Sequence, residues 1–254
     1  MKYWNYKQQK YDNMKGLIMG ITTIFFDLDG TLLPMDNDVF TKGYFKLLVQ
    51  KLSPYGYDPQ ELVSAIWKGT EAMVKNDGSQ TNYDAFWKTY TAIFGNSAYD
   101  NIKLFDDFYS NEFDKAKEFC GYEPQIEEIV HVCRNKGYRL VVAANPIFPM
   151  AAQKSRLSWA GISSDCFEYI SSYENSHFCK PDTRYFSEIM DAMNISPENC
   201  LIIGNDVNED MIARSLGAFV FLLPNYIINH DGKDISVYPN GNYDDLKKFL
   251  ESNI

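Results

Sequence analysis

Short apolar runs alternate with helical patterns along this chain, most regularly in its C-terminal half. Four runs rich in β-branched and aromatic residues predict buried strands, and a shorter fifth run predicts another. Strands that alternate with helices indicate a parallel sheet covered by helices on both faces, so the expected fold class is α/β. The predicted strands span residues 21–26, 138–144, 201–204 and 219–223, with the shorter one near 167–171.

The helical patterns between these runs place apolar residues at spacings of three and four. In the first pattern, Gly137 suits the position just after a helix end. In the second, Pro181 suits the first turn of a helix, where its missing N–H leaves no hydrogen bond unmade. These patterns predict helices over residues 125–136, from 181 onward, over 208–216 and over 243–250.

The segment from Pro34 to Tyr122 differs because it lacks a convincing strand and its apolar residues recur at helical spacing. Its many aromatic side chains are interpreted as helical core rather than as a surface for stacking a ligand. We therefore expect an all-helical domain inserted after the first strand. The predicted divisions are a polar leader over 1–15 (with Met14 and Met19 as alternative starts), the inserted domain over 35–122, and a core formed by 16–34 and 123–254.

Composition narrows the class of protein. The 254 residues are 45% hydrophobic and 23% charged, which is typical of a globular protein with a substantial core, and no run approaches the length of a transmembrane helix. A formal net charge of −10 argues against a general binder of nucleic acid or of anionic membranes. The five cysteines form no C-x-x-C pair, which favours reduced thiols and a cytoplasmic location.

Acidic residues follow two of the predicted strands. Asp27 and Asp29 come directly after the first strand, and Asp206 and Asp210 follow the strand at 201–204. Together they would bring four negative charges to one edge of the sheet, with Lys180 the only cation among the motifs. Such a cluster needs a hard divalent ion, and oxygen ligands suit Mg²⁺.

This set of residues has the parts that phosphoryl transfer requires. Asp27 can attack phosphorus to give an aspartyl-phosphate. Asp29 can protonate the leaving oxygen and later take a proton from the attacking water. Lys180 and backbone N–H groups can neutralise charge on the remaining phosphate oxygens. The sequence therefore predicts a phosphoryl-transfer site.

Four motifs in order resemble those of the haloacid dehalogenase (HAD) superfamily of phosphotransferases. They are D-x-D-G-T at 27–31, a strand end just before Asn145, Lys-Pro at 180–181 and G-x-D-x-x-x-D at 204–210. The resemblance covers about 18–223 and implies a Rossmann-like core. Because the inserted segment lies between the first and second motifs, it resembles a helical cap that closes over the active site and favours small soluble substrates.

The resemblance implies a role for each matching residue. Asp27 is similar to the nucleophile and a metal ligand, and Asp29 to the acid/base, which ligates the metal through its backbone carbonyl. Asp206 resembles the third protein ligand of Mg²⁺. Asp210 resembles the acid behind these ligands that orients the site and Lys180, and Lys180 resembles the phosphate-binding lysine.

Ala144 departs from the family pattern, in which a Ser or Thr at this strand end donates a hydroxyl to the phosphate. We expect the backbone N–H or side chain of Asn145 to supply part of the missing contact. Losing one donor to a charged oxygen costs roughly 1.5–3 kcal/mol of transition-state stabilisation. The change therefore predicts weakened rather than abolished activity.

These features favour a Mg²⁺-dependent phosphatase that acts on a small phosphorylated metabolite, with no nucleic-acid or membrane partner. Asp29 argues against a true dehalogenase of the superfamily, which lacks this acid. Two alternatives stay open: a phosphomutase, and a catalytically weak protein that senses a phosphorylated ligand or partner, which Ala144 favours. The identity of the substrate and the oligomeric state do not follow from the sequence.

Overall fold

The computed structural model of this chain describes residues 20–95, 98 and 102–253. The predicted leader over 1–15 and both alternative starts, Met14 and Met19, lie outside these residues. Within the described part, no helix is both long enough and apolar enough to cross a membrane.

All five predicted strands form, and they make one parallel sheet in the order β3-β2-β1-β4-β5. The predicted α/β fold class is therefore confirmed. The order of strands reverses beside β1, and such a switch point in an open parallel sheet is where ligands usually bind. The strands are β1 (Thr23–Phe26), β2 (Arg139–Val142), β3 (Tyr169–Ile170), β4 (Cys200–Gly204) and β5 (Phe219–Leu222).

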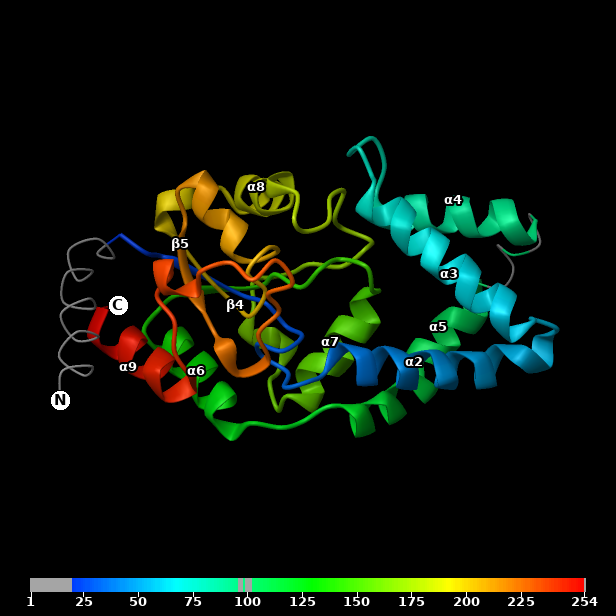
Figure 1. The fold of residues 1–254 in the computed structure, drawn as a ribbon, viewed down its shortest axis with the longest axis horizontal. Coiled ribbons are helices and arrows are strands. Elements are labelled where there is room, and N and C mark those ends of the chain that lie inside the picture. Colours follow the sequence, from blue (N-terminus) through cyan, green and yellow to red (C-terminus); the bar gives the residue numbers. More distant parts are fainter. Residues whose placement is uncertain (1–19, 96–97, 99–101, 254) are drawn as a thin grey trace.

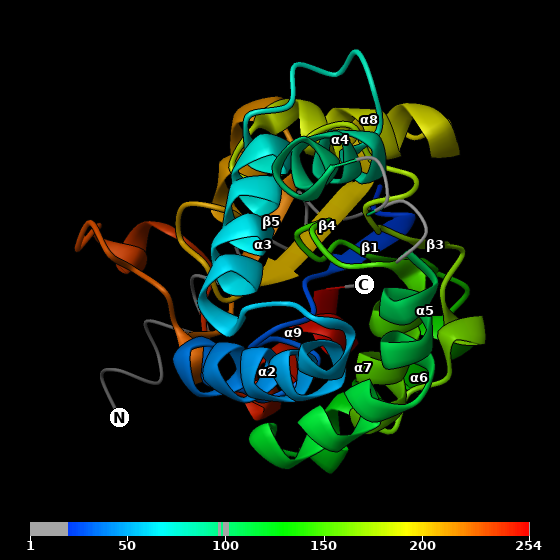
Figure 2. The same cartoon turned by 90° about the vertical axis from the view of Figure 1, so that its right-hand side faces the viewer.

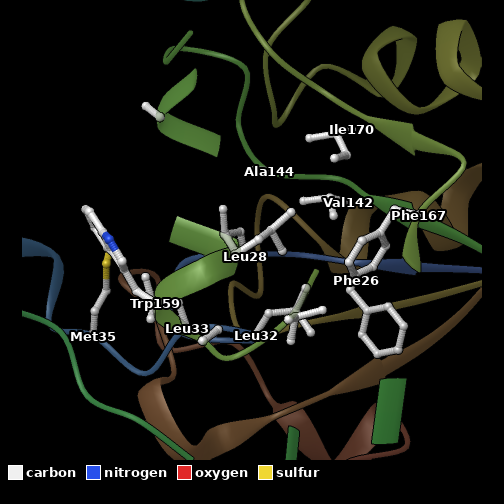
Figure 3. Packing of buried hydrophobic residues seen from close by; sticks show 14 of the residues in the cluster. Phe26, Leu28, Leu32, Leu33, Met35, Val142, Ala144, Trp159, Phe167 and Ile170 are labelled. Carbon is white, nitrogen blue, oxygen red and sulfur yellow. The ribbon is translucent and has the colours of Figure 1, made fainter. Parts of the chain in front are cut away.

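Helices cover both faces of the sheet (Figure 1). Because successive strand residues point to opposite faces, Ile24 and Phe26 belong to one buried cluster and Phe25 to the other. Figure 3 shows part of the first cluster, around Phe26 and Leu32. The helices of the first face are α6 (Pro124–Asn135), α7 (Met150–Trp159) and α9 (Tyr243–Asn253), and those of the second are α8 (Thr183–Met193) and the 3-10 helix η6 (Met211–Leu216).

The register of the central strands brings their carboxyl ends to the same level. Phe26 of β1 pairs with Val142 of β2 on one side and with Ile203 of β4 on the other. The backbone N–H of Asp27 continues this ladder by donating to the carbonyl of Ile203 at 2.9 Å. The residues that follow these three strands therefore share one edge of the sheet.

The segment between β1 and α6 is helical, as predicted, and its helices lie together beyond that edge of the sheet (Figures 1 and 2). Side chains of Asp36, Asp58 and Thr81 cap three of them by accepting hydrogen bonds from first-turn N–H groups. We refer to these helices as the cap; its boundaries at 35 and 122 stay a prediction. They are α2 (Asn37–Leu52), α3 (Pro59–Val74), α4 (Asn82–Phe94), α5 (Ile102–Ser110) and the 3-10 helix η3 (Glu112–Phe119).

Three local expectations need correction. Pro181 lies outside α8, because Asp182 is the N-cap and accepts the N–H of Arg184 at 2.9 Å. The helix expected over 208–216 is the shorter 3-10 helix η6. Helix α7 was not predicted. Further short 3-10 helices are η1 (Ser53–Tyr55), η4 (Ser164–Cys166), η5 (Pro197–Asn199), η7 (Pro224–Tyr226) and η8 (Ile235–Val237).

Candidate active site

A buried lysine joins two of the predicted acids at the end of β1. The Nζ of Lys180 donates to Asp27 Oδ1 at 2.8 Å and to Asp210 Oδ1 at 2.6 Å. Burial alone would lower the pKa of Lys180, but the carboxylates of Asp210 and Asp27 hold that pKa well above its ordinary value. The lysine is therefore a fixed cation against the predicted nucleophile.

A tight turn after β4 places the other two acids. Asp210 Oδ2 accepts the backbone N–H of Asp206 at 2.9 Å, and Asp206 Oδ1 accepts those of Asn208 and Glu209 at 2.7 and 2.9 Å. A Cβ on Gly204 would lie 2.1 Å from Asp210 Oδ2, so only glycine allows this close approach. The close contact between Gly204 and Asp210 therefore explains why the fourth motif has glycine at its first position.

Asp29 is held by Arg156, a residue of α7 that the sequence analysis missed. The guanidinium forms an ion pair with Asp29 Oδ2, hydrogen-bonds Gln153 and lies 4.4 Å from the ring centroid of Phe148. Burial raises the pKa of Asp29, and the positive charge of Arg156 opposes this effect without cancelling it. Its signal in the sequence is weak: Arg156 lies on the buried face of α7, a helix that was not predicted.

Asn145 follows the end of β2, where its amide Nδ2 donates to Glu209 Oε2 at 3.1 Å. Burial raises the pKa of Glu209 to about 8. Asn145 Oδ1 and Asp29 Oδ1 are buried and, among the described residues, have no hydrogen-bond partner. Unsatisfied buried acceptors are costly, so both atoms indicate a place for a ligand, a water molecule or a proton.

Ala144 lies differently from the other predicted site residues. Its side chain belongs to the first hydrophobic cluster together with Val142 and Ile170 (Figure 3). Its carbonyl accepts the hydroxyls of Ser171 and Tyr185 at 2.7 and 2.8 Å. The hydrogen bonds of its carbonyl therefore hold the backbone at the end of β2 in place. Its predicted part in phosphate binding stays a prediction.

A cavity of about 280 Å³ lies between the carboxylates and the cap. The predicted site residues Asp27, Asp29, Asn145, Asp206 and Asp210 all contribute to its core side, whereas Lys180 lies behind Asp27 and Ala144 lies in the hydrophobic cluster. The aromatic residues of the cap are thus both core and cavity wall. Those that line the cavity are Phe40, Tyr44, Phe45, Trp67, Phe86, Trp87, Phe105 and Tyr109.

The donors at the core side fit a hard cation. Asp27 and Asp206 supply carboxylate oxygens to the same cavity, and the side chain of Asp29 is engaged by Arg156, which leaves its backbone carbonyl as the donor that the resemblance implies. Across the described residues, no three His, Cys, Asp or Glu side chains are placed to hold a metal by themselves. An incomplete set of oxygen donors suits Mg²⁺, which keeps several waters and shares substrate oxygens.

Comparison with known sequences points to one family. A sequence model of the haloacid dehalogenase-like hydrolases matches residues 21–215. The chain is 27% identical to a glyceraldehyde 3-phosphate phosphatase from Methanothermobacter thermautotrophicus, over 84% of this chain and 90% of that protein. It is 24% identical to a phosphoglycolate phosphatase from Nitrosospira multiformis, over 85% of this chain and 87% of that protein.

Solved structures agree on the fold. A HAD-hydrolase from Bacillus subtilis, solved with bound magnesium, matches with a TM-score of 0.54 at 18% identity, over 92% of this chain and 99% of that one. The family match spans strands β1 to β4 and the motifs at 27–31, 180–181 and 204–210. The chain therefore belongs to the haloacid dehalogenase-like hydrolases, as the order of its motifs predicted.

Proposed function

We propose that this hydrolase is a Mg²⁺-dependent phosphatase that cleaves a small phosphorylated metabolite through an aspartyl-phosphate on Asp27. The observation that carries the proposal is the buried group of Asp27, Lys180 and Asp210 at the carboxyl end of β1, beside the cavity. Two relatives that are named as phosphatases support hydrolysis of phosphoric monoesters.

In the proposed reaction, a carboxylate oxygen of Asp27 attacks phosphorus and the bond from phosphorus to the ester oxygen breaks. Lys180 holds the other carboxylate oxygen of Asp27 at 2.8 Å and fixes the direction of attack. Water then attacks the phosphorus of the aspartyl-phosphate, which releases phosphate and restores the Asp27 carboxylate. The first step therefore uses a nucleophile that is already held in position.

Asp29 supplies the proton for the leaving alkoxide and takes one back from the attacking water. Burial, which raises its pKa, favours the protonated form that the first step needs. Because Arg156 holds Asp29 Oδ2 in this structure, the other oxygen, Oδ1, is the one without a partner in the described part of the chain. We assign the proton transfer to Oδ1.

Mg²⁺ would be held by Asp27, Asp206 and the Asp29 carbonyl, and when bound it would neutralise the negative charge of the phosphate and of the surrounding carboxylates. Asp206 is positioned for this role by the two backbone N–H groups that fix its Oδ1.

We also propose a cytoplasmic location for this protein. All five cysteines are free thiols, which supports that location.

The test is hydrolysis of p-nitrophenyl phosphate by the wild type and by Asp27→Asn, each with Mg²⁺ and with EDTA. We expect turnover that needs Mg²⁺ and falls on the order of a thousandfold in Asp27→Asn. The matched control is Asp38→Asn, which changes an exposed acid of α2 outside the cavity and should retain full activity. Turnover that survives in Asp27→Asn, or that is equal in EDTA, would overturn the proposal.

A further inference from the structure

The cap side of the cavity is lined mainly by aromatic rings, with the uncharged polar side chains of Asn37, Thr41 and Thr70 among them. Trp67 of α3 lies against Phe45 of α2 with ring centroids 5.5 Å apart, and Trp87 of α4 lies against Phe105 of α5 at 5.1 Å. All four side chains line the cavity. Within the described ranges, 20–95, 98 and 102–253, no lysine, arginine or histidine lines it.

The two buried cations of the candidate site are already committed to other partners. Arg156 is fully buried, pairs with Asp29 and lies over the ring of Phe148. Lys180 is buried between Asp27 and Asp210. Neither guanidinium nor ammonium is therefore offered to the part of a substrate that extends into the cap.

The charged side chains that line the cavity all lie on its core side, which makes the uncharged cap side selective. The acids Asp27, Asp29, Asp206, Glu209 and Asp210 all line the cavity. A leaving group with a carboxylate would lose its hydration against the aromatic rings of the cap, where no lysine, arginine or histidine of the described residues lines the cavity to pair it. An uncharged apolar leaving group would instead gain by leaving water.

Two tyrosines contribute hydroxyl groups to the cap wall of the cavity. The hydroxyls of Tyr44 and Tyr109 hydrogen-bond each other at 2.8 Å. Burial raises the pKa of Tyr44 to about 12 and also raises that of Tyr109, so both stay neutral at physiological pH. This part of the wall can accept a neutral polar substituent but gives no charge to bind an acid.

We propose that the substrate is a phosphoric monoester of an alcohol whose leaving group is a single uncharged ring or a branched apolar group, rather than a carboxylated or small polar one. This rests on the proposed phosphatase function and names its substrate class. The cavity volume of about 280 Å³ lies at the lower end of the roughly 300–1,000 Å³ range of ligand pockets, which favours a compact leaving group such as a single ring.

The test compares kcat/KM for benzyl phosphate, 2-phosphoglycolate and glyceraldehyde 3-phosphate. All three release an alkoxide, so differences report the cavity rather than an activated leaving group. We expect kcat/KM for benzyl phosphate to exceed both others by about ten- to a hundredfold, the gain from burying a ring. Equal values, or a preference for either polar ester, would overturn the proposal.

A matched pair of variants tests the missing cation directly. Thr41 of α2 is half-buried and lines the cavity. Thr41→Arg should raise kcat/KM for 2-phosphoglycolate and lower it for benzyl phosphate, whereas the uncharged Thr41→Gln should leave the order of preference unchanged. If Thr41→Gln shifts the preference as far as Thr41→Arg does, charge is not the determinant and the proposal fails.

Two further arms separate this proposal from the proposed function. Acetyl phosphate releases acetate, a small and weakly basic leaving group that has little contact with the cap, so its Asp27-dependent hydrolysis together with a preference for 2-phosphoglycolate would overturn the substrate class alone. Binding by calorimetry needs no turnover: benzylphosphonate should bind at least about tenfold more tightly than phosphonoacetate. The reverse order of binding would overturn the substrate class even in an inactive protein.

Discussion

Arg156 shows how one buried side chain can fix the geometry of a carboxylate in the active site. Its guanidinium is fully buried, and it contacts Asp29 from the β1 loop and Gln153 from its own helix. Gln153 in turn donates to the carbonyl of Ser171 at 2.8 Å. Asp29 is thus tied through two side chains to the segment that follows β3.

We predict that Arg156→Met lowers the free energy of unfolding by about 2–3 kcal/mol, because it leaves the partly buried carboxylate of Asp29 without its cation. Urea unfolding should show this loss, and the double variant with Asp29→Asn should be less destabilised than the sum of the two single variants. The control is Arg184→Met, which removes a largely exposed ion pair with Asp182 and a contact with the ring of Phe178, and should cost less than about 1 kcal/mol. Additive effects of Arg156→Met and Asp29→Asn would contradict a coupled pair.

The sequence predicted the acids of this site more completely than their partners. Asp27, Asp206 and Asp210 could be predicted because each follows a strand, and residues that follow neighbouring parallel strands meet at one edge. Arg156 could not, since its partner Asp29 is 127 positions away and no local pattern connects them. Whether a buried arginine is paired depends on residues from other elements, which periodicity does not display.

At the level of elements, strands were predicted well because β-branched and aromatic runs stay buried on both faces of a parallel sheet. Helix α7 was missed for the opposite reason. Two of its buried residues, Gln153 and Arg156, are polar, so its apolar stripe is incomplete. The approach of the cap helices to the site was also beyond prediction, because helical spacing shows which face is apolar but not what lies opposite.

The close packing of α3 on α4 gives a prediction for the cap. A Cβ on Gly69 would lie 2.5 Å from the ring of Phe86, which is itself packed against Trp87 and Tyr90 at 5.2 and 5.9 Å. Although alanine favours a helix over glycine by about 1 kcal/mol, we expect Gly69→Ala to destabilise the protein by about 1–2 kcal/mol. Thermal unfolding measures this difference.

Two variants make the interpretation of Gly69→Ala specific. Phe86→Leu removes part of the ring that the new methyl would meet, so it should cost less in the Gly69→Ala background than in the wild type. Lys68→Ala changes the exposed neighbour on the same helix and should have little effect. If Gly69→Ala were more stable than the wild type, α3 and α4 could move apart without loss of packing energy, and the prediction would be wrong.

At the scale of the whole molecule, the cap meets the core at points far apart in the sequence. Two segments of the chain connect the core to the cap, one on each side of the cap helices. They touch where the N–H of Gly121 donates to the carbonyl of Pro34 at 2.6 Å. A second contact lies at the start of α4, where the N–H groups of Asn82 and Tyr83 donate to carbonyls of Ser176 and Tyr173 at 2.8 and 2.7 Å. First-turn N–H groups have no partner within their own helix, so this end of α4 gains by docking on the core.

The side chain of Asn82 strengthens the second contact. It is fully buried, and its Nδ2 lies 3.3 Å from the carbonyl of Pro146 and 3.4 Å from that of Phe178. These two carbonyls belong to the segments that follow β2 and precede Lys180. One amide therefore connects the cap to both sides of the candidate site, and its loss should be felt where cap and core meet rather than in the sheet.

We predict that Asn82→Ala speeds amide hydrogen exchange in residues 173–179 and in the first turn of α4, because it removes hydrogen bonds worth about 1–3 kcal/mol at a buried contact. Exchange in β1 and β4 should stay as slow as in the wild type. Asn111→Ala, which removes an exposed contact to Asp107 inside the cap, is the control and should not change exchange in 173–179. Equal acceleration of exchange throughout the sheet in Asn82→Ala would show that the contact supports global folding instead. Unchanged exchange in 173–179 would show that the cap is held on the core by its two connecting segments alone.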